Sequence, residues 1–204
     1  MTARLHLGDL PEGFDPGPAL AVDTETLGLQ TLRDRLCVVQ VSRGDGSADV
    51  VQIPRGGPPP ERLLRILADP GVLKIFHFAR FDLAAIHHAF GVMPEPVYCT
   101  KIASKLTRTY TDRHGLKDLC RDLLGVEMSK QQQSSDWGAD ALTPAQVDYA
   151  ASDVLHLHAL KERLDALLAR EGRAGLAGAC FAFLPTRARL DLAGWPETDI
   201  FAHS

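Results

Sequence analysis

Four polar residues recur at spacings that would bring their side chains together in a folded chain. Asp23 and Glu25 are separated by one residue and follow a short apolar run, residues 19–22, which predicts a buried strand. Residues two apart in an extended segment point the same way, so both carboxylates can face one point in space. Tyr149 and Asp153 are four apart, the spacing that stacks two side chains on one side of a helix. Each pair suits a shared site.

A fourth carboxylate, Asp82, follows a second predicted strand, residues 72–76, and begins a predicted helix over 81–90. Four carboxylates gathered at one end of a sheet repel each other strongly unless cations compensate them. Hard divalent ions with oxygen ligands, Mg²⁺ or Mn²⁺, are the natural compensation. Two such ions stabilise the attacking and leaving oxygens of a phosphoryl displacement, and a phenol at the same site can orient the attacking water. The residue types therefore indicate metal-dependent phosphoryl chemistry.

Each of these residues also has a purely structural interpretation. An aspartate that ends a strand is often a helix N-cap or a turn former, and Tyr149 fits a core aromatic equally well. Their joint occurrence in the order D-x-E, F-D and Y-x-x-x-D favours the shared site.

The elements that must position these side chains alternate between strands and helices. Apolar runs predict strands over 19–22, 36–41, 50–53 and 72–76, with the turn 43–47 making a hairpin of the second and third. Helical spacing predicts helices over 61–67, 81–90, 99–106 and 116–124. The longest predicted helix begins at Thr143 and Pro144, an N-cap threonine before a first-turn proline, and runs to about residue 172. The prediction is a mixed α/β fold with a meander-like sheet flanked by helices.

Composition excludes several classes of protein. The chain has 204 residues, 45% apolar and 24% charged, which excludes disordered, fibrous and collagen-like proteins. Lys and Arg number 22 against 26 Asp and Glu, a net charge of -4, so the chain does not hold nucleic acid through a large positive field. A local binding site remains compatible with that balance.

The cysteines and the N-terminal residues predict a cytoplasmic protein. Cys37, Cys99, Cys120 and Cys180 are far apart in the sequence, so there is no C-x-x-C pattern and they are best read as reduced thiols. Residues 1–13 lack the apolar core of a signal peptide, and no window reaches the length of a membrane span.

Three motifs together resemble those of the DEDD-superfamily 3′→5′ exonucleases. They are Asp23-Thr24-Glu25 with Leu27-Gly28-Leu29, then residues 77–82 (HFARFD), then residues 149–153 (YAASD). The tyrosine is typical of the DEDDy branch, and Ser135-Asp136-Trp137 resembles the ribonuclease D group within it. The resemblance spans about residues 19–170 and implies a ribonuclease-H-like exonuclease fold.

The whole chain, including residues 34–40, 107–114 and 199–204, is similar to the nano-RNase C family. That family consists of single-domain enzymes that degrade very short RNAs, dinucleotides above all, and assemble into ring-like octamers. The resemblance implies one 3′→5′ exonuclease domain over residues 1–204. We expect the apolar C-terminal extension, residues 173–204, to pack on that domain or to form a subunit interface.

The same resemblance implies a mechanism. Asp23, Glu25, Asp82 and Asp153 would hold two Mg²⁺ or Mn²⁺ ions at the scissile phosphate, and Tyr149 would position the attacking water. Nucleoside 5′-monophosphates would leave from the 3′ end of short RNA. Two alternatives stay open: a general exonuclease that trims longer RNA or DNA, and a non-catalytic nucleic-acid-binding module. The module would predict loss of an acidic ligand, and none is missing.

Substrate contacts are expected around the motifs. The resemblance implies that Leu29 is a wedge between two bases, with Thr24, Leu27 and Gly28 beside it; without the resemblance, a loop leucine that covers the core fits equally. Phe78 and Phe81 could offer ring faces to a base or belong to the core. His77 stands where many DEDD exonucleases have asparagine, and its imidazole can bond a phosphate or a sugar hydroxyl. Finally, a hydrogen-bonding cap on a 5′ phosphate is predicted from Lys130, Gln133, Ser134 and Ser135, with a solvated loop as the alternative.

Overall fold

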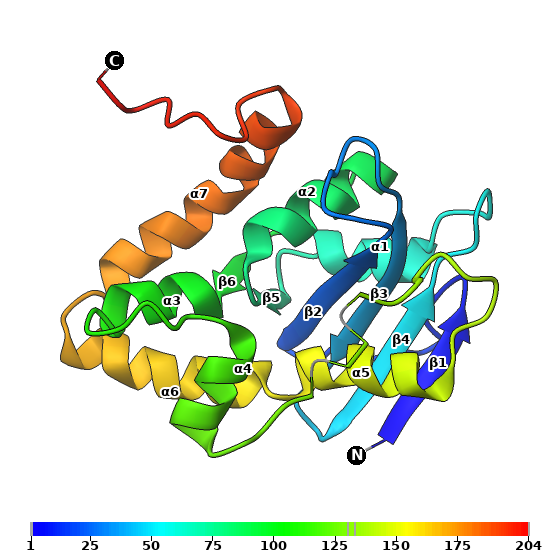
Figure 1. Cartoon of the computed structure of the whole chain (residues 1–204), viewed down its shortest axis with the longest axis horizontal. Coiled ribbons are helices and arrows are strands. Elements are labelled where there is room, and N and C mark those ends of the chain that lie inside the picture. The colour runs from blue at the N-terminus through cyan, green and yellow to red at the C-terminus, as the bar shows by residue number, and fades with distance from the viewer. Residues whose placement is uncertain (1, 130, 133, 204) are drawn as a thin grey trace.

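A computed structural model describes residues 2–129, 131–132 and 134–203 of the chain. Its centre is a six-stranded sheet in the order β1-β4-β3-β2-β5-β6 (Figure 1). The strands are β1 (Thr2–Leu7), β2 (Ala19–Thr26), β3 (Leu36–Ser42), β4 (Ser47–Gln52), β5 (Leu73–Phe76) and β6 (Val97–Cys99). Strands β2, β3 and β4 are antiparallel neighbours, whereas the pairs β1–β4, β2–β5 and β5–β6 are parallel. The predicted mixed sheet and its hairpin are confirmed.

Helices cover both faces of this sheet. They are α1 (Glu61–Ala68), α2 (Ala79–Phe90), α3 (Thr100–Thr107), α4 (Leu116–Leu119), the π-helical turn η1 (Cys120–Leu124), α5 (Pro144–Leu155), α6 (Leu157–Arg170) and α7 (Ala174–Leu192). Helix α5 packs on β1 to β4, and α2 packs on β2, β3, β5 and β6. Every residue of β3 and β4 is buried, because these strands are covered on both sides. Among the described helices, none is long and apolar enough to cross a membrane.

The strand that carries the first motif is longer than its apolar run. Residues 19–22 predict a strand that stops before Asp23, but β2 continues to Thr26. Asp23 pairs with Gln40 of β3 and Glu25 with Val38, and a bulge follows between Glu25 and Thr26. The polar side chains of residues 23–26 hide this part of the strand from a search for apolar runs. Backbone pairing with β3 nevertheless keeps these residues in the strand. Asp23 and Glu25 therefore project from within the sheet.

The predicted long helix from residue 143 to about 172 is wrong as one element. Its start is right, because the Gln146 backbone amide donates to Thr143 Oγ1 and the Thr143 backbone amide donates to Gln146 Oε1, which together form a capping box. The helix breaks at His156, where α5 ends and α6 begins. Helix α5 packs on the sheet and α6 packs on α3, so the apolar faces of the two helices point toward different partners.

Three elements, β1, β6 and α7, have no counterpart in the sequence-based prediction. Strand β1 is an edge strand whose residues are all partly or fully exposed, and β6 has only three residues, too few to show a period. Cys99, predicted to begin a helix, ends β6, and α3 starts one residue later.

Helix α7 lies beside α2 and leads into the C-terminal tail (Figure 1). It packs on α2 and β6, with the rings of Phe181 and Tyr98 4.6 Å apart. Arg80 of α2 forms a bidentate ion pair with Asp191 near the end of α7. The single-domain organisation and a subunit contact through residues 173–204 stay predictions.

Candidate active site

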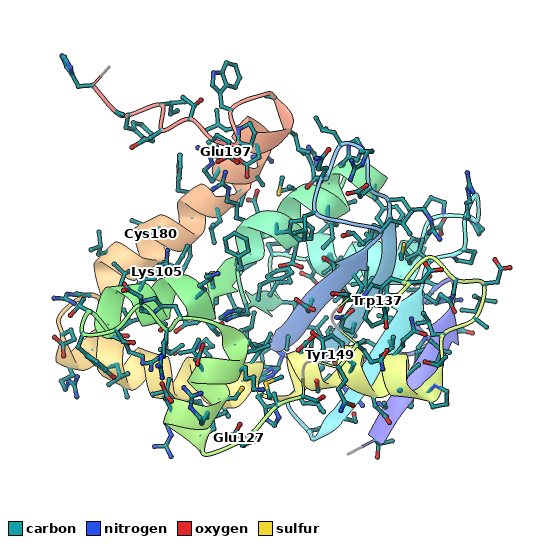
Figure 2. All side chains as sticks on the ribbon, viewed as in Figure 1. Lys105, Glu127, Trp137, Tyr149, Cys180 and Glu197 are labelled. Atoms are coloured by element: carbon teal, nitrogen blue, oxygen red, sulfur yellow. The ribbon has the colours of Figure 1, made fainter. Side chains whose placement is uncertain are left out.

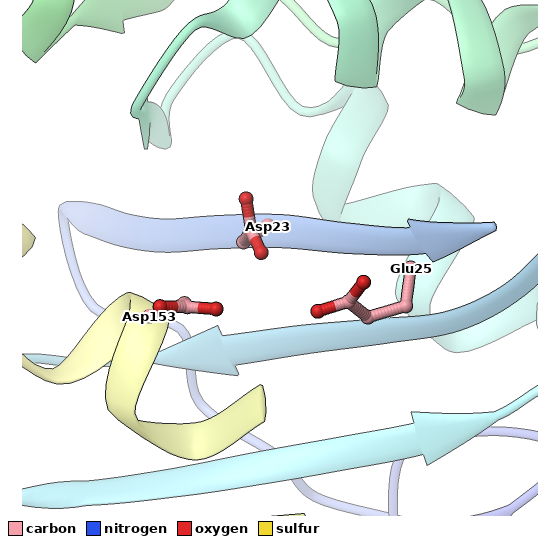
Figure 3. A group of neighbouring side chains, drawn as sticks. All are labelled: Asp23, Glu25 and Asp153. Carbon is pink, nitrogen blue, oxygen red and sulfur yellow. The ribbon is translucent and has the colours of Figure 1, made fainter. Parts of the chain in front are cut away.

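Three carboxylates converge where β2 meets α5. One oxygen each of Asp23, Glu25 and Asp153 lies within 4.8 Å of the others. Figure 3 shows Asp23 and Glu25 projecting from the same side of β2, with Asp153 reaching toward them from α5. The two-residue spacing on the strand and the packing of α5 on β2 together produce this cluster.

Tyr149 lies one turn before Asp153 on α5 and is half-buried at the same site. Its ring is 6.0 Å from that of Trp137, a buried residue in the segment before α5 (Figure 2). The indole packs beside the phenol ring. Burial, and then the charges of Asp153, Glu25 and Asp23, raise the pKa of Tyr149.

Asp82 lies next to the cluster and is held by a hydrogen bond from Thr24. Thr24 lies between Asp23 and Glu25 on β2, and its Oγ1 donates to Asp82 Oδ1 at 2.7 Å. Asp82 occupies the first turn of α2 and is almost fully buried. Its charge raises the pKa of both Asp23 and Glu25, so it acts electrostatically on the cluster. The structure therefore groups three of the four predicted acids and sets the fourth beside them.

The cluster is strongly disfavoured as a set of free carboxylates. Burial, and then the charges of Asp153 and Asp82, raise the pKa of Glu25 to about 9. Burial raises the pKa of Asp82 and of Asp153 to about 7, and it raises the pKa of Asp23 well above its usual value. Raised values at several adjacent acids are the expected signature of a site built to hold positive charge.

A pocket of about 740 Å³ opens over the cluster. Two lysines, Lys101 and Lys117, line it, against four carboxylates: Asp23, Glu25, Asp118 and Asp153. With these carboxylates ionised, the lining formed by the described residues is net negative. A phosphate group would be repelled from this surface unless cations were bound there first.

Most of the predicted substrate residues line this pocket. They are Thr24, Leu27, Gly28, Leu29, His77, Phe78, Phe81, Ser134 and Ser135. Leu29 is 85% exposed, so the interpretation as a loop leucine covering the core is wrong. Lys130 and Gln133, predicted to belong to the phosphate cap, lie outside the described residues.

Phe78 has an unusual backbone at the mouth of the pocket. Its φ of 66° lies in the left-handed region that a phenylalanine rarely adopts, at the N-cap of α2. The ring is 44% exposed, and the ammonium of Lys101 lies 4.3 Å from its centroid. Phe78 is therefore outside the core and forms part of the pocket surface.

The residues of the site that were absent from the predicted set include Gln40, Lys101, Lys117, Asp118 and Trp137. Gln40 had a signal, since it is the one polar residue in the apolar run 36–41. It faces Asp23 across the β2–β3 pair. The two lysines sit on surface helices, where no sequence pattern separates them from other lysines.

Comparison with known proteins agrees with this geometry. The model of a 3′-5′ exonuclease domain family matches residues 7–169. The chain belongs to this exonuclease family. Ribonuclease D of Granulibacter bethesdensis is 36% identical over 159 residues, which cover 76% of this chain and 39% of that protein. The chain thus spans about two fifths of the length of the curated ribonuclease D proteins that it matches.

Solved structures of Brucella melitensis NrnC match the whole chain, and one of Escherichia coli RNase D matches most of it. Brucella melitensis NrnC with bound Mg²⁺ is 60% identical, with a TM-score of 0.96, and the same protein bound to pGG is 61% identical, with a TM-score of 0.97. In both cases the match covers 100% of each chain. Escherichia coli RNase D is 26% identical with a TM-score of 0.76, over 88% of this chain and 48% of its own. The α/β fold and the family expected from the motifs are confirmed.

Proposed function

We propose that this chain is a divalent-metal-dependent 3′→5′ exoribonuclease that acts on very short RNA, dinucleotides above all. The observation that carries the proposal is the cluster of Asp23, Glu25 and Asp153 within 4.8 Å, on the floor of a nucleotide-sized pocket. Nucleoside 5′-monophosphates would leave from the 3′ end of the substrate.

The residues of the cluster fit a hard divalent cation. All the donors are carboxylate oxygens, the ligand type that Mg²⁺ and Mn²⁺ prefer. We assign Asp23, Glu25 and Asp153 to hold the metal and Asp82 to complete the set, with two ions as the proposed number. When bound, the ions would neutralise the carboxylates and supply Lewis acidity to the phosphate and to the attacking water.

Tyr149 is assigned to orient that water. Because the surrounding acids and burial raise its pKa, the phenol keeps its proton at neutral pH. A protonated hydroxyl both donates and accepts hydrogen bonds, so it can fix the position of a water molecule but does not remove its proton. Trp137 packs against the ring and limits its rotation.

The preference for dinucleotides is supported by the pocket and by a relative. Leu29 is the most exposed large apolar side chain of the chain's described part and lies on the pocket rim, a place from which it can wedge between two bases. Brucella melitensis NrnC, similar over its full length, has been solved bound to pGG. Ser134 and Ser135 line the same pocket and are proposed to contact the 5′ phosphate with Lys130 and Gln133.

An assembly of several copies in the cytoplasm is part of the proposal, with an octamer as the expected form. The C-terminal segment carries exposed apolar side chains suited to a subunit contact. Phe183 of α7 is 38% exposed, Phe201 of the tail is 76% exposed, and their rings lie 5.9 Å apart. Exposed aromatic groups of this kind often mark protein interfaces.

A second candidate is trimming of longer RNA or DNA. It is favoured by the similarity to E. coli RNase D, which is described as an exoribonuclease involved in structured RNA processing. The two candidates differ in the dependence of rate on substrate length.

The decisive experiment compares kcat/KM for RNA and DNA of two, five and twenty nucleotides, with Mg²⁺ and with Mn²⁺. We expect the dinucleotide RNA to be cleaved fastest, and faster with a 5′ phosphate than without. Leu29→Ala should lose this length preference, whereas Leu32→Ala, an exposed leucine of the same loop outside the main pocket, should keep it. Equal rates at all lengths would support the trimming enzyme.

A further inference from the structure

One histidine of the pocket is held by a buried threonine. His77 Nδ1 lies 2.9 Å from Thr100 Oγ1, and that hydroxyl donates to the backbone carbonyl of Phe76 at 3.2 Å. Thr100 and Phe76 are completely buried. Water therefore does not compete for the Thr100 hydroxyl. The donor in one of its two hydrogen bonds, to His77 or to Phe76, then determines the donor in the other.

These contacts determine which ring nitrogen carries the proton. A threonine hydroxyl has a single proton, and a carbonyl oxygen can only accept. Because the Thr100 proton goes to Phe76, the Thr100 oxygen accepts from His77, and Nδ1 must be the protonated nitrogen. The opposite assignment would leave two buried oxygens facing each other without a proton between them. The neutral His77 ring thus has its lone pair on Nε2.

The ring is also neutral under physiological conditions. Burial, and then the adjacent charge of Lys101, lower the pKa of His77 to about 3. Nε2 has no partner among the described residues and is absent from the set of buried unpartnered atoms, so it is open to the pocket that His77 lines. His77 Nε2 therefore presents an unprotonated hydrogen-bond acceptor to the pocket.

We propose that His77 Nε2 accepts a hydrogen bond from a sugar hydroxyl of the bound nucleotide and so selects for it. The proposal rests on the function proposed above. Of the two contacts open to an imidazole here, a phosphate oxygen is excluded, because it is an acceptor too and would meet the Nε2 lone pair. An asparagine, by contrast, offers a donor and an acceptor and could serve either group. The chemistry recognised is a ribose hydroxyl, 2′ or 3′.

The protonation state is tested by ¹⁵N NMR of histidine-labelled protein, with His77→Phe used to assign the His77 signals. We expect the shifts to show Nδ1 protonated and Nε2 unprotonated from pH 6 to pH 8. Thr100→Val removes the acceptor of Nδ1 and should bring the two shifts closer together. A protonated Nε2 in the unmodified protein would overturn the proposal.

The hydroxyl contact is tested by kinetics on dinucleotides that lack single hydroxyl groups. In three of the substrates the 3′-terminal nucleotide carries ribose, 2′-deoxyribose or 3′-deoxyribose. A fourth substrate lacks the 2′ hydroxyl of the 5′ nucleotide. We expect one of these losses to lower kcat/KM about 3- to 10-fold, the usual effect of one hydrogen bond between neutral groups. That same loss should have no effect in His77→Phe. A glutamine amide oxygen can occupy the place of Nε2, so His77→Gln should restore the discrimination.

Several outcomes would contradict the proposal. Discrimination that persists unchanged in His77→Phe would show that another group reads the sugar. Equal losses for all substrates in every His77 variant would show a purely structural role. His77→Gln and His77→Asn are the fallback if the phenylalanine variant does not fold, since an asparagine side chain is too short to reach the Nε2 position and should fail where glutamine succeeds.

A binding measurement separates this proposal from the proposed function. Adenosine 5′-monophosphate, its 2′-deoxy form and its 3′-deoxy form are titrated while the Nε2 shift is followed, which requires no turnover. A chain that binds the nucleotide with the expected Nε2 shift but cleaves no RNA would refute the exonuclease function and keep the His77 contact. A chain that cleaves dinucleotides, but whose Nε2 shift does not change when the product binds, would keep the exonuclease function and refute the His77 contact.

Discussion

Gln40 donates its side-chain amide to Asp23 Oδ2 at 2.7 Å from the position directly across the β2–β3 pair. Gln40 is completely buried, so the bond is shielded from water. It holds one oxygen of Asp23 and fixes the plane of the carboxylate, with its other oxygen left for a cation. Residues behind a metal ligand commonly set its orientation in this way.

The first prediction concerns Gln40→Leu, which keeps the approximate volume and removes the donor. We expect Mn²⁺ affinity, measured by calorimetry, to fall about 10-fold or more. Without the bond from Gln40, the Asp23 carboxylate loses conformational entropy when it binds the metal. Gln52→Leu is the matched control, since Gln52 is a buried glutamine on β4 whose amide bonds the Ala139 carbonyl instead. An equal loss of affinity in both variants would refute an orienting role for Gln40.

The second prediction concerns the phenol. Tyr149→Phe should lower kcat about 100-fold with little change in KM, as expected for loss of one group that positions a reactant. Tyr110→Phe is the control, because Tyr110 is 79% exposed and does not line the pocket. A loss in KM alone would place Tyr149 in substrate binding.

The third prediction is that Asp153→Asn abolishes turnover and stabilises the metal-free protein. Replacing one of the mutually repelling acids with an isosteric amide relieves the repulsion that raises the pKa of Glu25 and of Asp23. For a chain of this size, each kcal/mol gained raises the melting temperature by about 2–4 °C. Addition of Mg²⁺ should raise the melting temperature of the unmodified protein but not that of the variant. A destabilised metal-free variant would contradict the description of the cluster as a repulsive set.

The fourth prediction is a pH dependence of stability that metal removes. The folded pKa is about 9 for Glu25 and about 7 for Asp82 and Asp153, all above the unfolded values. Between about pH 5 and pH 9 the folded metal-free chain therefore binds more protons than the unfolded chain, and its free energy of unfolding falls as the pH rises.

Saturating Mg²⁺ should flatten this decline, since the cation takes the place of the protons. Mn²⁺ affinity should increase over the same pH range for the same reason. Urea unfolding at several pH values, with EDTA and with Mg²⁺, measures both effects. A metal-free protein whose stability rises from pH 5 to pH 9 would show that other groups dominate the titration.

The sequence by itself determined which chemical groups are present and how they are spaced. The two-residue step from Asp23 to Glu25 and the four-residue step from Tyr149 to Asp153 are periods of a strand and a helix, so local geometry alone places each pair on one side. Thr143 and Pro144 likewise mark the start of α5, because capping depends on neighbouring residues only. Asp23, Glu25, Tyr149 and Asp153 were predictable for this reason, whereas most of the pocket-lining residues were predicted from the resemblance of the surrounding motifs to those of the exonuclease family.

Only the tertiary structure decided how these local pieces meet. Gln40 reaches Asp23 because of the register between β2 and β3, and Thr24 reaches Asp82 because α2 packs on β2. The break at His156 depends on the partners of α5 and α6, and the proton position on His77, in the loop between β5 and α2, depends on Thr100 at the start of α3. Each of these relations joins residues distant in sequence or follows from distant packing partners. Such contacts depend on packing and register, which residue type and spacing do not specify.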